Sequence, residues 1–215
     1  MFEEFLKKLN TEILKDLPGF SAQKLMAPLG RRPPADYIKQ DISPKMSAVL
    51  ILLYPQKDTF EVKTVFILRP DNEGGSHAGQ IAFPGGGFDS SDKDLSATAL
   101  REAEEEIGVD RASVTLLGAL SPLYIPVSNY LVHPYLGTIK NAPTFKLDPL
   151  EVKGVLEVEL NELLSEKNKG AVEKYLRVKD TTTKVPCYTI GGEIIWGATA
   201  MIISELEEII RRIKG

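Results

Sequence analysis

The chain has 215 residues, of which 43% are hydrophobic and 26% are charged, and its formal net charge at pH 7 is −4. These values suit one α/β domain of moderate size with enough apolar residues for a core. The negative charge argues against a nucleic acid as partner, because binding a phosphate backbone normally requires a basic surface. One cysteine, Cys187, excludes an internal disulfide and fits a reducing compartment. With no signal peptide and no apolar run of membrane-spanning length, the sequence predicts a cytoplasmic protein without a membrane partner.

Residues 1–43 favour a helical extension packed on the domain that follows. Apolar residues from Phe2 to Ile13 recur at helical spacing, and Pro18-Gly19 ends this pattern. A second short helix is predicted over residues 22–26, and three prolines between 33 and 44 indicate an irregular connector. We therefore divide the chain into an N-terminal helical extension, 1–43, and a main domain, 44–215. The extension could instead form part of a dimer interface, and the sequence is compatible with a monomer or a homodimer.

The main domain alternates apolar strand patterns with turns and helical patterns. Residues 47–54 and 64–68 predict two buried strands joined by a turn at 56–58. The remaining expectations are a strand at 80–83, a strand beginning near 114, two apolar stretches around a loop at 126–129, a run at 154–164 ending in a helix, a strand at 184–190, and a final helix with an apolar stripe between Ile202 and Ile213.

Residues 85–109 contain a glycine-rich loop followed by a helix that is rich in glutamate. At about 100° per residue, Glu102, Glu105 and Glu106 share one face of this helix, whereas Glu104 projects elsewhere. The opposite side carries a narrow apolar stripe that suits core packing. Its members are Leu100, Ala103 and Ile107. Gly108 stands where a helix commonly ends in a left-handed residue.

Three carboxylates on one helix face repel one another, and a cation between them removes that repulsion. Oxygen ligands of this kind suit Mg²⁺ or Mn²⁺. A solvated acidic helix face is the alternative interpretation of the same glutamates. The residues before the helix favour a ligand site, because Gly85 and Gly86 allow the backbone to turn tightly and to approach a ligand.

This segment resembles the box of the Nudix hydrolase family, G-x5-E-x7-R-E-U-x-E-E-x-G-U, in which U is a bulky aliphatic residue. Residues 101–109, REAEEEIGV, match its second half, with Ala103 as a small residue at the first U. The early glutamate position holds Lys93 when counted back from Arg101 and Asp92 when counted forward from Gly86, so the loop is one residue longer. The resemblance implies an α/β fold, an α/β/α sandwich with a mixed central sheet. It also implies hydrolysis of a nucleoside diphosphate linked to another group.

Two flanking stretches resemble the coenzyme A (CoA) diphosphatase branch of this family. They are residues 76–86, SHAGQIAFPGG, before the box, and residues 196–200, WGATA, before the final helix. Many members have a basic residue where this chain has Gly75, and the spacing from Arg69 to His77 is one residue longer than usual. The resemblance implies cleavage of CoA or acyl-CoA to 4′-phosphopantetheine and adenosine 3′,5′-bisphosphate. A diphosphatase for ADP-ribose or a dinucleotide, and a non-catalytic nucleotide-binding regulator, are the alternatives.

The resemblance also implies roles for individual residues. The expected catalytic residues are Arg101, Glu102 and Glu105. The expected ligands of Mg²⁺ or Mn²⁺ are Glu102, Glu105 and Glu106, with a carbonyl of Gly85 or Gly86. The expected substrate-binding residues are Arg69, His77, Gln80, Ser128 and Asn129. His133 is expected to be structural, and Glu151 is interpreted as a helix-start or structural carboxylate, with a catalytic base from outside the box as the alternative.

Overall fold

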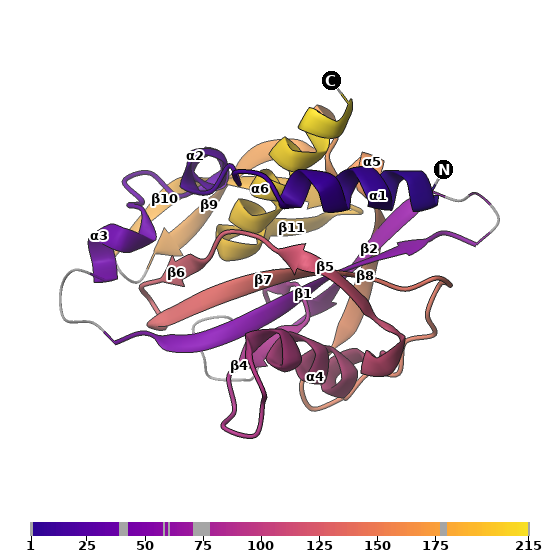
Figure 1. The fold of residues 1–215 in the computed structure, drawn as a ribbon. Coiled ribbons are helices and arrows are strands. Elements are labelled where there is room, and N and C mark those ends of the chain that lie inside the picture. The colour runs from indigo at the N-terminus through magenta and orange to yellow at the C-terminus, as the bar shows by residue number, and fades with distance from the viewer. Residues whose placement is uncertain are drawn as a thin grey trace.

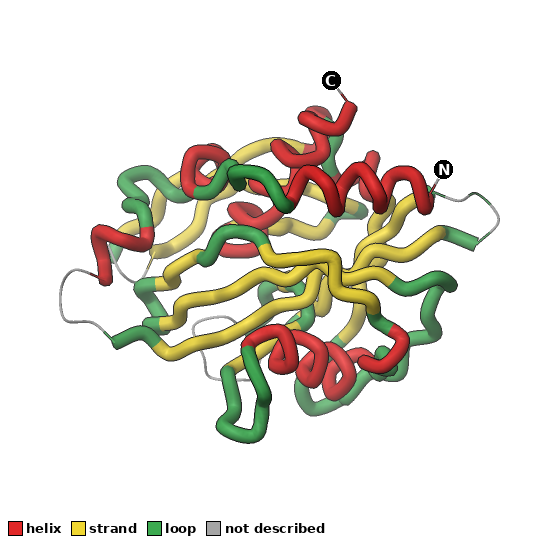
Figure 2. Tube along the Cα trace, viewed as in Figure 1, coloured by secondary structure: helices red, strands yellow, loops and turns green. Residues whose placement is uncertain are grey.

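The computed structural model describes residues 2–38, 43–57, 59, 61–70, 78–176 and 180–214. Three layers are visible, with a mixed β-sheet between helix α4 on one face and helices α1, α2 and α6 on the other (Figures 1 and 2). The expected α/β/α sandwich with a mixed central sheet and helices at the N-terminus is therefore confirmed. Within the part of the chain that the structure describes, no helix combines the length and the apolar composition that crossing a membrane requires.

Eight strands form the central sheet, with the order β3-β2-β1-β7-β5 along its main path. Strand β4 also pairs with β1, β6 with β7, and β8 with β2. Only β1 and β7 run parallel among these described pairs. The strands are β1 (Lys45–Pro55), β2 (Val62–Leu68), β3 (Ile81–Ala82), β4 (Gly85–Gly87), β5 (Thr115–Ala119), β6 (Leu123–Ile125), β7 (Tyr130–Thr138) and β8 (Gly154–Glu159).

Strand β1 is buried on both faces, which explains its nearly continuous apolar sequence. Successive side chains of a strand point to opposite faces. Leu50 and Leu52 pack in the cluster beneath α4, whereas Ile51 and Leu53 pack in the cluster that includes α1 and α6. The central sheet thus separates two apolar cores.

Helix α4 (Leu95–Ile107) is the predicted glutamate-rich helix. The side chain of Asp94 caps its start by accepting hydrogen bonds from two backbone N–H groups, and Gly108 ends it with a φ of 70°. Ala103 and Ile107 are buried against the sheet, as the apolar stripe predicts. The opposite face is therefore free to present carboxylates. The glycines before α4 form the short strand β4 rather than a loop, because they pair with β1.

The N-terminal helices and the C-terminal helix share one core. They are α1 (Phe2–Ile13), α2 (Phe20–Gln23), the 3-10 helix η1 (Lys24–Met26) and α6 (Gly197–Lys214). The short helix α3 (Pro34–Ile38) instead contacts β6. Glu205 of α6 is fully buried and accepts hydrogen bonds from the Gly19 N–H at 3.0 Å and the Gln23 side chain at 2.8 Å. The apolar stripe of α1 packs in the same cluster as α6. The division of the chain at residue 43 stays a prediction.

Several segments differ from the sequence-based expectations. Helix α3 lies in the proline-rich connector, where a proline suits the first helical position because its missing N–H has no helical partner there. Residues 197–200 form the first turn of α6 and do not precede it. A second sheet has the order β11-β10-β9, and of its strands the sequence predicts β10 but neither β9 nor β11. Its strands are β9 (Lys169–Leu176), β10 (Thr181–Ile190) and β11 (Glu193–Trp196), and the remaining short helices are η2 (Arg111–Ser113), α5 (Leu160–Leu163) and η3 (Glu166–Asn168).

Candidate active site

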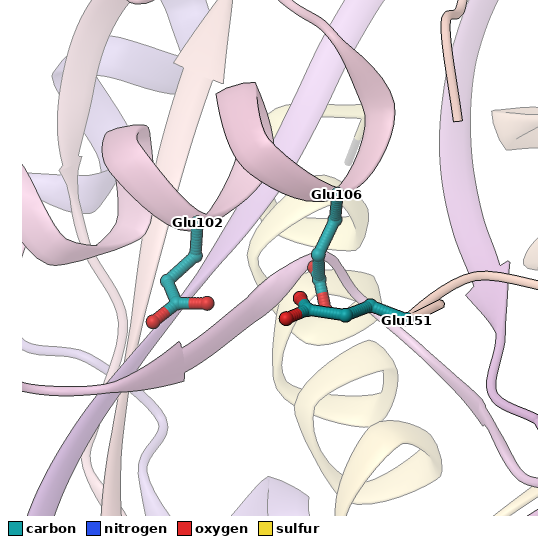
Figure 3. Close-up of side chains that lie close together, drawn as sticks. All are labelled: Glu102, Glu106 and Glu151. Carbon is teal, nitrogen blue, oxygen red and sulfur yellow. The ribbon is translucent and has the colours of Figure 1, made fainter. Parts of the chain in front are cut away.

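Three carboxylates converge beside α4 (Figure 3). Glu102 and Glu106 lie one turn apart on the helix, and Glu151 reaches them from the loop before β8. One oxygen of each lies within 4.8 Å of the other two. The group therefore combines two predicted ligands, Glu102 and Glu106, with Glu151, which the sequence favours as a structural carboxylate.

Glu106 is the most enclosed member of this group, with 3% of its surface exposed. The N–H of Gly85 in β4 donates a hydrogen bond to its Oε2 at 2.8 Å. Burial raises the pKa of Glu106 to about 8, opposed by this hydrogen bond and by the charge of Arg69. A buried carboxylate with neighbouring carboxylates is unfavourable unless a proton or a cation neutralises it.

Glu102 lies directly against β4. A Cβ atom added to Gly86 would be 2.4 Å from the carboxylate carbon of Glu102, so a larger residue here would displace this carboxylate from its position. Burial raises the pKa of Glu102, and the hydrogen bond from Arg101 opposes this effect. The glycines of β4 therefore determine how closely the helix carboxylates approach the sheet.

Arg101 connects the helix to the turn before it. Its Nε and Nη2 donate to the two carboxylate oxygens of Asp92, each at 2.9 Å, and Nη2 also donates to the Gly87 carbonyl at 3.1 Å. Its Nη1 donates to Glu102 at 2.9 Å and Glu105 at 2.8 Å. The Arg101 guanidinium accordingly holds the pKa of Asp92 well below its usual range. Asp92, rather than Lys93, is thus the early residue that supports the helix.

The other two glutamates of α4 lie outside the converging group. The Glu105 side chain shares the predicted face, but it is about half exposed at 53% and is paired with Arg101. Glu104 projects away, as predicted, and forms an ion pair with Arg111 at 3.0 Å. The helical spacing therefore predicts the directions of both side chains correctly, but it does not predict that Glu105 pairs with Arg101.

The loop from residue 146 to residue 153 brings Glu151 to the site. Its backbone is hydrogen-bonded to the C-terminal end of α4, because the Lys146 N–H donates to the Ile107 carbonyl at 3.0 Å and the Asp148 N–H donates to the backbone carbonyl of Glu106 at 3.1 Å. Glu151 lies in a turn, so the helix-start interpretation is wrong. Its only signal in the sequence was the Asp-Pro-Leu-Glu-Val stretch at residues 148–152.

A cavity of about 530 Å³ adjoins this acidic cluster through β4. Its wall includes Gly85 and Gly86, which contact the two helix carboxylates, and three of the predicted substrate-binding residues. These three are Arg69, Gln80 and Ser128. Other parts of the wall come from β1 and β7, from the loop between β6 and β7, from the segment before α3, from β9, and from the junction of β11 with α6. The cluster and the cavity thus meet at the glycines of β4.

A family model described as NUDIX domain matches residues 44–178 of this chain. The chain belongs to the Nudix family. A Photorhabdus laumondii protein named as an uncharacterized Nudix hydrolase, NudL, is 40% identical over 136 residues, which are 63% of this chain and 71% of the relative. A Yersinia pestis protein with the same name is 37% identical over 146 residues, 67% of this chain and 71% of the relative.

Solved structures of Nudix proteins share the fold. The M. smegmatis Nudix hydrolase RenU aligns with a TM-score of 0.53 over 79% of this chain and 87% of RenU, at 13% sequence identity. A MutT/nudix family protein from Enterococcus faecalis aligns with a TM-score of 0.53 over 82% of this chain and 68% of that protein, at 18% identity.

This Nudix hydrolase is accordingly an enzyme that acts on diphosphate bonds. Nudix hydrolases generally use divalent metals, and the carboxylates of Glu102, Glu106 and Glu151 fit such an ion. They offer hard oxygen donors, and the buried, desolvated Glu106 gains most from a nearby cation. The residues of the Nudix box are thus arranged as metal ligands would be.

The described residues that line the cavity do not include three further residues considered in the sequence analysis, which are Asn129, His77 and His133. Asn129 does not line the cavity; it has a φ of 54°, and its side chain accepts from the Tyr124 hydroxyl at 3.0 Å and donates to the Ser43 carbonyl at 3.3 Å. His77 lies outside the described residues. His133 lies in β7 opposite Ala48, and burial lowers its pKa. The substrate-binding role of Asn129 stays a prediction that no contact of its side chain supports.

Proposed function

We propose that this Nudix hydrolase cleaves CoA or acyl-CoA to 4′-phosphopantetheine and adenosine 3′,5′-bisphosphate. The observation that carries the proposal is the acidic cluster beside a cavity of about 530 Å³, whose wall is largely apolar and also contains Arg69. A cavity of this size suits a nucleotide with an apolar extension. The stretches at 76–86 and 196–200 that resemble the CoA diphosphatase branch add support from the sequence.

We assign Glu102, Glu106 and Glu151 as ligands of Mg²⁺ or Mn²⁺. When bound, the ion neutralises charge on the diphosphate and lowers the pKa of the attacking water. Arg101 acts as a positioning residue, because its hydrogen bonds hold the carboxylates of Glu102 and Glu105. Gly85 positions Glu106, because its N–H donates a hydrogen bond to one carboxylate oxygen and leaves the other oxygen available for the metal ion.

Glu151 is our choice for the residue that accepts the proton from water, through the carboxylate oxygen that does not serve as a ligand. Its residue surface is exposed, and no hydrogen bond or ion pair with another described residue engages its carboxylate. Glu105, one of the expected catalytic residues, is already paired with Arg101 at 2.8 Å. A carboxylate that accepts a proton during turnover must be reachable by water, and Glu151 meets this condition.

Arg69 is positioned to bind the phosphates of the substrate. It lines the cavity, and its charge lowers the pKa of Glu106, so it lies at the boundary between the acidic cluster and the cavity. A guanidinium at such a boundary can bind phosphate oxygens in a bidentate manner.

The proposal is tested by measuring hydrolysis of CoA, acetyl-CoA, ADP-ribose and a diadenosine polyphosphate with Mg²⁺, with Mn²⁺ and with EDTA. We expect the kcat/KM for CoA to exceed that for ADP-ribose by at least tenfold, and EDTA to abolish turnover. Preference for ADP-ribose or the dinucleotide would refute the CoA assignment while leaving the Nudix chemistry intact. Binding of these compounds without turnover would instead indicate a nucleotide-binding regulator.

A further inference from the structure

Arg31 lines the cavity, although it lies in the N-terminal segment, far from the Nudix box in the sequence. It belongs to the N-terminal segment between η1 and α3, outside residues 44–178 that match the family model. Helix α3 lies beside the end of the sheet at β6, as Figure 1 shows. The Arg31 Nη2 donates a hydrogen bond to the backbone carbonyl of Tyr124 in β6, and its guanidinium carbon lies 5.7 Å from the centre of the Tyr37 ring. These contacts hold the guanidinium at the cavity wall.

The charge of Arg31 has no carboxylate partner among the described residues. The ion pairs of the described chain do not include it, and its interactions are with the Tyr124 carbonyl and the Tyr37 ring. Its Nε is buried and has no hydrogen-bond acceptor in the described residues. Burial lowers the pKa of Arg31, which means that the surroundings disfavour its charge. A partly buried cation is less favourable than a solvated one unless an anion accompanies it.

The surroundings of Arg31 also indicate the class of anion. The same cavity wall contains the aromatic rings of Tyr37, Tyr130 and Trp196, which suit a base or another flat group. It also contains Gly85 and Gly86, which adjoin the carboxylates that we assign to metal and diphosphate binding. One ligand in this cavity can therefore place a diphosphate at β4 and a second anionic group at Arg31. A planar guanidinium with free donors matches a phosphate monoester.

We propose that Arg31 binds a phosphate monoester of the substrate that is separate from the diphosphate being cleaved. This inference rests on the proposed function, because CoA carries such a group on its ribose whereas dephospho-CoA and ADP-ribose do not. Arg31 would then determine specificity from a segment that the family model does not cover. Its role would be in substrate binding, with no part in the bond-breaking step.

Binding can be measured without turnover through Trp196. It is the only tryptophan of the chain and it lines the cavity, so its fluorescence reports ligands that enter. We expect adenosine 3′,5′-bisphosphate to bind at least tenfold more tightly than adenosine 5′-monophosphate to the full-length protein. Arg31→Gln should remove this difference. Arg32→Gln is the matched control, because Arg32 is exposed and does not line the cavity, and it should keep the difference. An Arg31→Gln variant that keeps the difference would overturn the proposal.

A second measurement uses the unmodified protein and does not depend on the folding of a variant. Phenylglyoxal labels accessible arginines, and mass spectrometry of peptides separates Arg31 from Arg32. Adenosine 3′,5′-bisphosphate should slow labelling of Arg31 at least tenfold and leave Arg32 unaffected. Absence of protection at Arg31 would overturn the proposal. Equal protection by inorganic phosphate at the same concentration would also overturn it, since Arg31 would then bind the free ion.

Kinetics connect this inference to the reaction while keeping the two claims separate. The ratio of kcat/KM for CoA to that for dephospho-CoA should fall at least tenfold in Arg31→Gln, whereas Arg32→Gln should keep the ratio of the wild type. An unchanged ratio would overturn the role of Arg31. If the wild-type protein hydrolyses neither compound, the proposed function fails, and the fluorescence and labelling results still decide whether Arg31 binds the phosphate monoester.

Discussion

Replacing Glu106 by glutamine is expected to stabilise the metal-free protein increasingly as the pH rises. Burial raises the pKa of Glu106 from 4.5 to about 8. The unfolded chain therefore loses this proton near pH 4.5, whereas the folded, metal-free protein keeps it to about pH 8. Between these values the folded state binds more protons than the unfolded state, so the free energy of unfolding of the wild type falls as the pH rises.

The magnitude follows from the difference between the two pKa values, which is 8 minus 4.5, or about 3.5. One pKa unit corresponds to about 1.4 kcal/mol. Glu106 should thus lower the free energy of unfolding by about 2 kcal/mol at pH 6 and by up to about 5 kcal/mol well above pH 8. Glutamine carries no charge and keeps an oxygen that can accept the hydrogen bond from the Gly85 N–H, so the variant should lack this loss.

Urea unfolding in EDTA at pH 6 and pH 8.5 measures this effect. Between the two pH values, we expect Glu106→Gln to gain about 2.5 kcal/mol relative to the wild type. Mg²⁺ at pH 8.5 should stabilise the wild type more than the variant, because the variant lacks one ligand. Glu104→Gln makes the same chemical change on the same helix at a partly exposed position, and it should show no such gain. A parallel pH dependence of Glu106→Gln and the wild type in EDTA would refute the reasoning.

Three further predictions concern turnover and the residues around the carboxylates. Glu106→Gln should lower kcat at saturating Mg²⁺ by at least two orders of magnitude while Glu104→Gln costs less than tenfold; equal losses would show that the helix face is assigned incorrectly. Gly86→Ala should lower metal affinity at least tenfold with little change in the fold, because its Cβ would meet the Glu102 carboxylate at 2.4 Å. Gly85→Ala should instead lower the melting temperature, because its Cβ would meet the Ala48 carbonyl oxygen at 2.3 Å. Calorimetry with Mg²⁺ and thermal melts would measure the two effects, and equal changes of metal affinity and melting temperature in both variants would contradict the prediction. Arg101→Lys should cost about 2 kcal/mol in urea unfolding and lower kcat, since an ammonium group cannot reproduce the paired hydrogen bonds to Asp92; a variant as stable as the wild type would contradict the positioning role.

Local patterns were sufficient to predict the elements that carry most of the site. The spacing of apolar and acidic residues predicted α4 and the directions of its glutamates, and Gly108 indicated its end. Strands β1 and β2 were predicted from their apolar runs because they are buried on both faces. Strand β9 was missed, since it alternates between exposed and half-buried residues and has no apolar run. These successes depend on residues that are close in the sequence.

The full composition of the site depends on contacts between distant residues, which periodicity does not report. Glu151 joins Glu106 only because the loop before β8 is hydrogen-bonded to the end of α4. Glu105 faces the expected direction, yet Arg101 pairs with it, and the choice between Asp92 and Lys93 required the geometry of the turn. No sequence pattern pointed to Arg31, because its lack of a carboxylate partner among the described residues is visible only in the three-dimensional structure.

The packing of β4 between α4 and β1 links the acidic cluster to the stability of the fold. The backbone of β4 pairs with β1 on one side, while Gly85 and Gly86 contact the carboxylates of Glu106 and Glu102 on the other. Because these carboxylates are held close together and partly desolvated, the metal-free state is under electrostatic stress that a divalent ion would relieve. Alterations of β4 should therefore change metal affinity through Gly86 and folding stability through Gly85, whereas changes at Arg31 should alter the preference between substrates. This separation lets one set of purified variants distinguish the chemistry of the box from the specificity of the cavity.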